Sequence, residues 1–456
     1  MSTRVLEALL GRFVYRAVRG LSLLCILCIS GAQSARAETT AACTDHITNL
    51  NSVALNKANA VYCLDNDITS GSGAFSIQAS GITLDGQNHT VSVSSGIYVT
   101  SGSKSNITIR NIKFTNGGFG NGDTQHDVSC ASNVCTANYW ITNWSIENSS
   151  FKTSGRGYSP WNQLSVLNNF SFKNNTVELL DSAGNMVQMH WVINSTFEGN
   201  TFKHTVANSS QTDESFGIML RDASSHNIFR NNIIATNGHN CMMLTGSGTG
   251  MKLKTVNDTR SSAFGYDNTL DSNVFISLPN SIGKSRDGAL ARQAVAGEDH
   301  IKNNIFYGVT TAGMSVTNGQ SNINGEIDHN TFINTTTSAY SAKSSNGASS
   351  NALTNNIFYG PFDPLISNSG SNHNLNGVNP NFVSALPTWS SLSNSADLKA
   401  MATSIRDALH LASNSPAKGA ASDGTDLGVN FGTAPTATPT PSNSAPQAPS
   451  LLRILP

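Results

Sequence analysis

Side chains that could bind an acidic ligand recur near the middle of the chain, in segments that alternate like β-strands. In GIMLRD, the alternation predicts that Ile218 and Leu220 point inward and that Met219 and Arg221 point outward. The residues that align on this outward face are Gln188, His190, Arg221 and Arg292. If two stacked repeats separate Arg221 from Arg292, they lie about 10 Å apart, close to the length of a disaccharide. Because a guanidinium can hold a carboxylate through two hydrogen bonds, the column suits an extended acidic ligand.

Other side chains in the same part of the chain could support binding. Those that could contact a sugar are Arg156, Tyr158 and Trp161. Asp213 and Glu214 could bind calcium from a loop, although as neighbours in a strand they would point to opposite faces. Each candidate also has a structural alternative: Arg221 as a solvated surface residue, His190 as a packed histidine, and the aromatic rings as packing on their own scaffold.

A repeat of about 26 residues must position these side chains. Similar segments, such as FKNNTV, FRNNII, IKNNIF and LTNNIF, begin at residues 109, 146, 172, 197, 229, 270, 301, 327 and 353. The successive intervals between these anchors are 37, 26, 25, 32, 41, 31, 26 and 26 residues. Each repeat holds short apolar strands separated by turns and lacks helical spacing. The sequence therefore predicts an all-β fold, a parallel β-solenoid of about ten coils.

Asparagine recurs at the fourth position of the last seven anchors, where a plain strand would disfavour it. These residues are Asn175, Asn200, Asn232, Asn273, Asn304, Asn330 and Asn356. In a coil of strands the backbone must bend in each turn, and asparagine tolerates the left-handed conformation of a bend. Stacked turns would also place the amides in register. We therefore expect an internal asparagine ladder that is architectural rather than catalytic.

Four repeats are longer than the basic period, by 11 residues before Ile146, 6 before Phe229, 15 before Leu270 and 5 before Ile301. Loops that rise from one side of a solenoid usually border its binding face. Since these insertions and most candidate side chains fall in the same repeats, the middle coils are the predicted site.

The ends of the chain read differently from the repeats. Residues 1–37 resemble an export signal, with arginines before the apolar run LSLLCILCIS and then ARA. Residues 38–80 would cap the first coil, 81–432 would form the solenoid, and the Pro/Thr/Ser-rich residues 433–456 would form a disordered tail. The segment 396–412 has helical character and is expected to cover the last coil.

Export and the low charge restrict the classes of partner. An oxidising compartment favours disulfides, and the expected pairs are Cys43 with Cys63 and Cys130 with Cys135, leaving Cys241 as a buried thiol. The formal net charge of -1 argues against a nucleic-acid partner. No segment after the signal is long and apolar enough for stable membrane insertion, and we expect a secreted, periplasmic or surface-exposed monomer.

The repeats resemble the secreted right-handed parallel β-helix proteins related to pectate lyases. GITLDGQNHTV, from Gly81, is similar to their first-coil signature, and NPNFVS, HLASNSPAKGA and DLG after Asn379 resemble a closing coil. The resemblance covers about residues 60–430 and implies a right-handed coil that binds an acidic polysaccharide and cleaves it by β-elimination. In that case Arg221 would act as base or carboxylate clamp, Arg292 as a second clamp and His190 as a catalytic residue.

Two alternatives to a lyase remain open. A non-catalytic surface, adhesion or carbohydrate-binding solenoid would show the same richness in Asn, Ser and Thr and the same low charge. A glycoside hydrolase would use Asp213 or Glu214 with Asp222. Metal-protease, phosphate-loop and nucleophile-elbow motifs are absent from the sequence.

Overall fold

The computed structural model describes the chain between residues 42 and 431, with gaps. The described residues are 42–71, 73–92, 95–100, 102–121, 128–131, 134–137, 139–153, 166–180, 186–204, 216–221, 224–236, 240–245, 252–253, 267–278, 290–293, 299–308, 314–317, 326–333, 340–343, 352–360, 373–387 and 395–431. The chain divides into two compact units, Met1–Ala42 and Cys43–Pro456. The predicted signal (1–37) and tail (433–456) lie outside the described residues.

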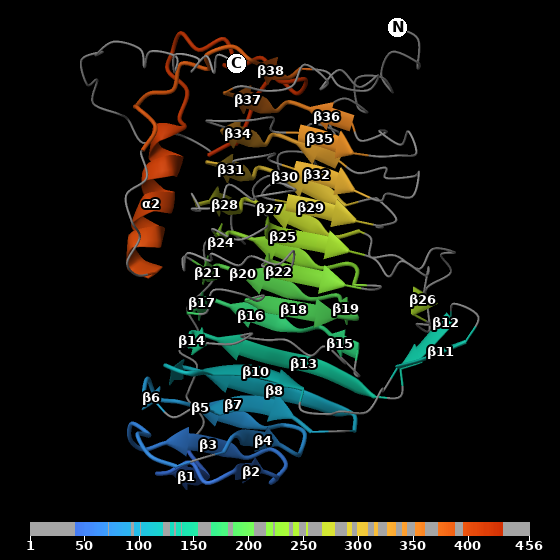
Figure 1. Ribbon diagram of the computed structural model, residues 1–456, viewed down its shortest axis with the longest axis vertical. Coiled ribbons are helices and arrows are strands. Elements are labelled where there is room, and N and C mark those ends of the chain that lie inside the picture. Colours follow the sequence, from blue (N-terminus) through green and yellow to red (C-terminus); the bar gives the residue numbers. More distant parts are fainter. Residues whose placement is uncertain are drawn as a thin grey trace, which may run out of the picture. The chain divides into compact units, whose positions relative to one another are not determined.

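Short strands stack in parallel to form the long faces of the second unit (Figure 1). The largest face is a 14-stranded sheet. Its strands in order are β1 (Asp45–Ile47), β3 (Val61–Leu64), β5 (Thr83–Asp85), β8 (Lys104–Arg110), β13 (Trp140–Glu147), β16 (Ser171–Lys173), β20 (Thr196–Glu198), β23 (Ile228–Arg230), β27 (Thr269–Asp271), β30 (His300–Lys302), β33 (Glu326–Asp328) and β36 (Ala352–Thr354). Beside this path lie β15 (Val166–Asn168) and β19 (Val192–Ile193).

The second face is an 11-stranded parallel sheet that follows the first in every coil. Its strands are β6 (Thr90–Val91), β9 (Lys113–Phe114), β14 (Ser150–Thr153), β17 (Thr176–Leu179), β21 (Thr201–His204), β24 (Ile233–Thr236), β28 (Val274–Ser277), β31 (Ile305–Tyr307), β34 (Thr331–Ile333), β37 (Ile357–Tyr359) and β38 (Leu375–Asn376).

Two shorter parallel sheets supply the third strand of the coil. The four-stranded sheet contains β2 (Val53–Leu55), β4 (Phe75–Ile77), β7 (Ser95–Val99) and β10 (Gly117–Asn121). The six-stranded sheet contains β18 (Val187–His190), β22 (Phe216–Arg221), β25 (Asn240–Thr245), β29 (Leu290–Gln293), β32 (Met314–Thr317) and β35 (Tyr340–Lys343). The chain passes through the three faces in a right-handed coil (Figure 1), which confirms the predicted parallel β-helix.

The predicted repeat anchors stack directly on one another in the 14-stranded sheet. Ile109 pairs with Ile146, Ile146 with Phe172, and each later anchor with the next, as far as Leu353. All of these anchor side chains are buried. The spacing therefore gave the register of this sheet correctly, insertions included.

The asparagine ladder is present and complete. The side-chain Oδ1 of Asn200 accepts a hydrogen bond from the Asn175 backbone N–H at 2.8 Å, and the same contact repeats in each coil up to Asn356 and Asn374. Each amide Nδ2 donates to a backbone carbonyl of a neighbouring coil, as Asn232 does to Phe197 at 2.9 Å. The ladder thus satisfies backbone groups that every bend leaves without strand partners.

The ladder asparagine and the residue before it, which is also asparagine in four of the seven repeats, have separate roles. The residue before each ladder asparagine takes the left-handed conformation, with φ of 54° at Asn174, 55° at Asn231 and 55° at Asn303. The ladder asparagines themselves have no positive φ. The bend and the ladder therefore use adjacent positions, and the short Asn side chain suits both, since it tolerates left-handed φ and carries a donor and an acceptor.

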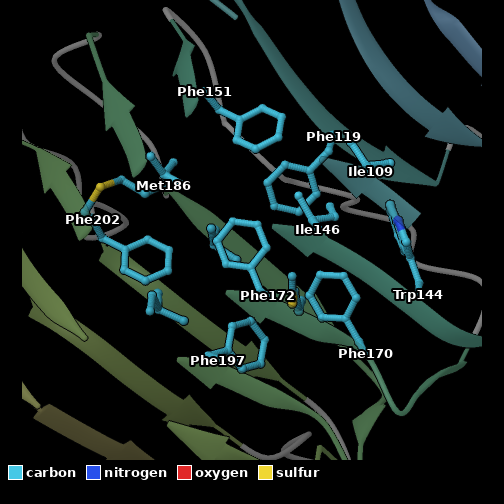
Figure 2. Packing of buried hydrophobic residues seen from close by; sticks show 14 of the residues in the cluster. Ile109, Phe119, Trp144, Ile146, Phe151, Phe170, Phe172, Met186, Phe197 and Phe202 are labelled. Atoms are coloured by element: carbon cyan, nitrogen blue, oxygen red, sulfur yellow. The ribbon is translucent and has the colours of Figure 1, made fainter. Parts of the chain in front are cut away.

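Phenylalanine rings fill the interior between the sheets (Figure 2). Figure 2 shows Phe151, Phe172 and Phe197 pointing into this space from successive coils. Farther along, Phe306 stacks on Phe275 and Phe332, with ring centroids 4.9 and 4.6 Å apart. Stacking of equivalent residues at the strand spacing makes the core continuous along the coil axis.

The cysteines agree with the prediction where they are described. Cys43 and Cys63 form a disulfide, which links the start of the second unit to β3. Cys241 is a free, buried thiol, and burial raises its pKa to about 12. Cys130 and Cys135 face each other in the antiparallel pair β11 (Val128–Ala131) and β12 (Val134–Ala137), but their side chains lie outside the described ones, so their disulfide stays a prediction.

The predicted C-terminal helix forms, but it does not cover the last coil. Helix α2 (Ser395–Ala408) lies against the outer face of the 11-stranded sheet (Figure 1). Its Leu398, Ala402 and Ile405 pack on outward-facing apolar residues of β24, β28 and β31, including Ile233, Val274 and Ile305. The prediction was wrong because these strands are apolar on both faces and need a second cover. No helix among the described residues is long and apolar enough to cross a membrane.

His329 connects the C-terminal segment around Thr425 to the last coils through hydrogen bonds. His329 donates to or accepts from Asp328 at 2.8 Å and Thr425 at 3.1 Å, and Asp423 lies 3.8 Å from its Nε2. The hydrogen bond to Asp328 raises the pKa of His329, although burial opposes the shift, and the charges of Asp328, Asp423 and Glu326 also favour the imidazolium.

We expect the contribution of His329 to stability to decline as the pH rises. Because the folded-state pKa lies above the unfolded one, the stabilisation is fully present below the unfolded pKa and disappears as pH passes the folded pKa. The loss in melting temperature caused by His329→Gln should therefore be larger at about pH 6 than at about pH 9. Thermal melts of both proteins across this range provide the measurement, and a loss that is equal at both ends would contradict the prediction.

Candidate functional site

The predicted residues Gln188, His190 and Arg221 lie together where the six-stranded sheet ends. Gln188 and His190 belong to β18, and the Nε2 atoms of their side chains are 3.1 Å apart. Arg221 is the last residue of β22 and lies opposite His190 in the next coil. His190 and Gln188 are buried, whereas Arg221 is partly exposed. A guanidinium and an imidazole therefore lie one coil apart, about 4.8 Å along the axis.

The register corrects the predicted column of Gln188, Arg221 and Arg292. Gln188 pairs with Met219 rather than Arg221, and Arg292 pairs with Leu244, which pairs with Leu220. The three polar residues thus occupy three different columns, and Arg292 holds a position equivalent to inward-facing leucines. Its side chain lies outside the described ones. Met219 is also buried at 7% exposure, although alternation predicted an outward position. The outer face of the six-stranded sheet is therefore covered around Gln188 and Met219.

A strained tryptophan follows His190. Trp191 has φ of 53°, a left-handed conformation that is unusual for a bulky residue. It forms the one-residue turn from β18 to β19 and packs with Val166 and Ile193, and partly buried Trp140 packs against this group. Strain of this kind costs free energy and is concentrated at functional sites. Packing of the Trp191 side chain, rather than the backbone preference of tryptophan, therefore sets the direction of the chain after His190. We call Gln188, His190, Trp191 and Arg221 the His190 corner.

The two longest insertions meet in one small accessory sheet. Strand β12 of the first insertion pairs with β11 on one side and with β26 (Lys252–Leu253) of the other insertion on its second side. Figure 1 shows this three-stranded sheet beside β13 and β15, away from α2. Ala137, the last residue of β12, packs against the group that contains Trp191. Both insertions thus rise on the same side of the coil, next to the His190 corner, as the spacing predicted.

A second polar ladder, which the sequence reading did not identify, fixes the turn into the 14-stranded sheet. Asn227 Oδ1 accepts from the Ser195 backbone N–H, Asn268 Oδ1 from Asn227, and Asp299 Oδ1 from Asn268 at 2.9 Å. All four side chains are buried. The ladder residue Asn227 lies between β22 and β23, so the ladder holds the backbone of the turn that follows Arg221. A polar residue two positions before the anchors Phe197 to Ile301 is the sequence signal that could have revealed it.

Several candidates lie outside the described residues: Arg156, Tyr158, Trp161, Asp213, Glu214 and Asp222. Their predicted roles in sugar contact, calcium binding and hydrolysis remain predictions. Among the described residues, no group of three His, Cys, Asp or Glu side chains could hold a metal ion.

A column of alternating charges is the largest feature that the sequence reading missed. The residue directly after each anchor from Ile109 to Ile327, and Asp85 after the equivalent Leu84, lies on the outer face of the 14-stranded sheet. These residues are Asp85, Arg110, Glu147, Lys173, Glu198, Arg230, Asp271, Lys302 and Asp328. We call them the charge column. Arg110 pairs with Asp85 at 2.8 Å, and Arg230 pairs with Glu198 at 2.8 Å. Reading one position beyond each anchor would have revealed it.

Comparison with known proteins gives little further information. No family model and no curated protein matches the chain. One similar solved structure is described as the crystal structure of pectate lyase Pel9A, with 13% sequence identity and a TM-score of 0.40 over 85% of this chain and 97% of that chain.

Proposed function

We propose that the protein binds an acidic polysaccharide at the His190 corner. The observation that carries the proposal is the placement of His190 and Arg221 in adjacent coils, beside a strained tryptophan and the accessory sheet. The partly exposed guanidinium of Arg221 would hold a uronate carboxylate through two hydrogen bonds. The accessory sheet would border the chain of sugars, because both insertions rise beside the corner.

We further propose β-elimination as the reaction at this corner. His190 would remove the proton from the carbon beside the carboxylate, while Arg221 neutralises the carboxylate and so makes that proton more acidic. The electron pair forms a C=C bond as the bond to the glycosidic oxygen breaks, and the protonated His190 returns its proton to that leaving oxygen. Gln188 would orient the His190 ring through its side-chain contact. Arg292 receives no role, because its register position matches that of Leu220 and Leu244.

We also propose that the protein is exported and that residues outside the described ranges contribute to binding. The Cys43–Cys63 disulfide supports an extracellular or periplasmic location, since such bonds persist in oxidising compartments. Residues 1–37 are proposed to direct export. Arg156, Tyr158 and Trp161 are proposed to contact sugar, and Asp213 with Glu214 to bind calcium.

Replacing Arg221 with alanine is expected to abolish lyase activity and to leave the fold intact. A partly exposed side chain contributes little to the core, whereas loss of a charge that stabilises the transition state reduces turnover by about a hundredfold or more. The measurement is the ultraviolet absorbance of the new double bond, with pectate, alginate and chondroitin as substrates. Circular dichroism and the melting temperature report on the fold.

Lys418→Ala is the matched control, since Lys418 is also an exposed cation but belongs to the C-terminal segment, where it pairs with Asp426. It should keep full activity. Activity that survives Arg221→Ala would remove Arg221 from the mechanism. Binding without any unsaturated product would support a non-catalytic carbohydrate-binding protein, and release of reducing ends without a double bond would support a hydrolase.

A further inference from the structure

The charge column lies on a different face from the His190 corner and follows the coil axis. Its negative residues are Asp85, Glu147, Glu198, Asp271 and Asp328, and its positive residues are Arg110, Lys173, Arg230 and Lys302. The signs alternate without exception over nine successive coils, and strand pairing places each member directly opposite the next. Charges of alternating sign therefore recur at a fixed spacing of one coil along the axis.

The centre of the column is the part most accessible to a partner. Side-chain exposure is 41% at Lys173, 27% at Glu198 and 46% at Arg230, against 14% at Arg110 and 9% at Asp85. Glu198 lies between its two cations, 3.6 Å from Lys173 and 2.8 Å from Arg230. The hydrogen bond from Arg230 lowers the pKa of Glu198, so the alternation persists through the neutral pH range. Ser171 and Thr196, on the same outer face, add hydroxyl groups one column away.

Neighbouring cations of the column are two coils apart. At about 4.8 Å per coil, this spacing is about 9.6 Å, close to the length of a disaccharide unit in an extended glycan. We propose that the exposed centre of the charge column binds a linear polysaccharide in which uronate residues alternate with neutral sugars. Each carboxylate then lies opposite a cation, and each neutral sugar presents hydroxyl or amide donors to the intervening Glu or Asp.

The alternation also selects against polymers of uronate alone. Such a chain carries a carboxylate on every sugar, about one per coil, so half of its charges would lie opposite Glu147, Glu198 and Asp271. Direct contact between a ligand carboxylate and one of these acidic side chains is unfavourable, and no cation lies opposite that carboxylate. Because adjacent opposite charges cancel at longer range, the column attracts a ligand only in contact and only in register. This selectivity distinguishes the column from a general basic patch.

The proposal does not depend on lyase activity at the His190 corner, and one experiment separates the two. Fluorescence anisotropy with the full-length protein would use two labelled probes of equal length, a hyaluronan decasaccharide and a decamer of galacturonate. Arg221→Ala disables the corner but leaves the column intact. In this background, the hyaluronan probe should bind and the galacturonate probe should bind at least about tenfold more weakly.

Two variants then test the column itself. The double variant Lys173→Glu/Glu198→Lys keeps the net charge but inverts the signs at the centre, and Arg230→Gln removes one well-exposed charge with little effect on folding. Both should weaken hyaluronan binding, the first by about tenfold or more. Lys418→Gln, another exposed cation in an ion pair, should bind like the parent protein.

Equal binding of the two probes, or hyaluronan binding unchanged in folded Arg230→Gln, would overturn the proposal. So would absence of hyaluronan binding by the folded Arg221→Ala protein. If Arg221→Ala alone abolishes binding of both probes, the corner binds acidic glycans and the column does not.

Discussion

Asn232→Leu is expected to lower the free energy of unfolding by about 4 kcal/mol, although leucine is apolar and of similar size. Asn232 is fully buried at the centre of the ladder. Its Oδ1 accepts from the backbone N–H of Asn200 at 3.0 Å, and its Nδ2 donates to the Phe197 carbonyl at 2.9 Å. Leucine leaves both backbone groups buried without partners, and the Oδ1 of Asn273 also loses a donor. Urea denaturation of both proteins measures the difference.

The neighbouring residue supplies the control. Asn231 has φ of 55° and is exposed, so glycine can replace it without loss of a buried hydrogen bond. We expect Asn231→Gly to change the free energy of unfolding by less than about 1 kcal/mol. If the two substitutions cost the same, the separate roles assigned to the asparagine pair are wrong.

The register of the 14-stranded sheet could be read from the sequence because its anchors are distinctive. Each of the last seven anchors is a single large apolar residue with the ladder asparagine three positions later, so insertions such as the 15 residues before Leu270 could not disguise it. The disulfide of Cys43 with Cys63 and the burial of Cys241 could also be predicted, since both follow from the position of the residue along the chain.

The six-stranded sheet could not be read in the same way. Its strands FGIMLR and NCMMLT are apolar at nearly every position, so alternation does not identify a single inward face. Arg292 was consequently placed one residue out of register, beside Arg221 rather than opposite Leu244. The same property explains the error on α2, because β24 and β28 are apolar on both faces and a reading that assumed one inward face did not reveal the need for a covering helix.

The charge column shows the opposite case, in which the information was present in the sequence. Charges directly after the anchors alternate in sign from Asp85 to Asp328. Their significance appears only when residues some 26 positions apart are compared, because no single segment contains two of them. Contacts between stacked coils are the natural unit for such a fold, and both ladders and the column are visible only at that level.

Gly217→Ala is expected to lower the free energy of unfolding by more than about 3 kcal/mol, a large effect for one methyl group. Gly217 lies in β22, four residues before Arg221. A Cβ atom at this position would lie 2.3 Å from the Cys241 carbonyl oxygen and 3.0 Å from Ile234 Cγ2. The oxygen belongs to the backbone of β25, which pairs with β22, so relief requires the two coils to separate.

Gly419→Ala distinguishes this steric effect from loss of glycine flexibility. Gly419 has φ of 62° and open space around the position of a Cβ, so alanine there meets only backbone strain, worth about 1 to 2 kcal/mol. Chemical denaturation should therefore show the larger loss at Gly217, where φ is not left-handed. In protein that still folds, displacement of β22 should also shift Arg221 relative to His190 and reduce the proposed activity. A Gly217→Ala protein as stable as the parent would mean that the two coils lie farther apart than this close contact implies.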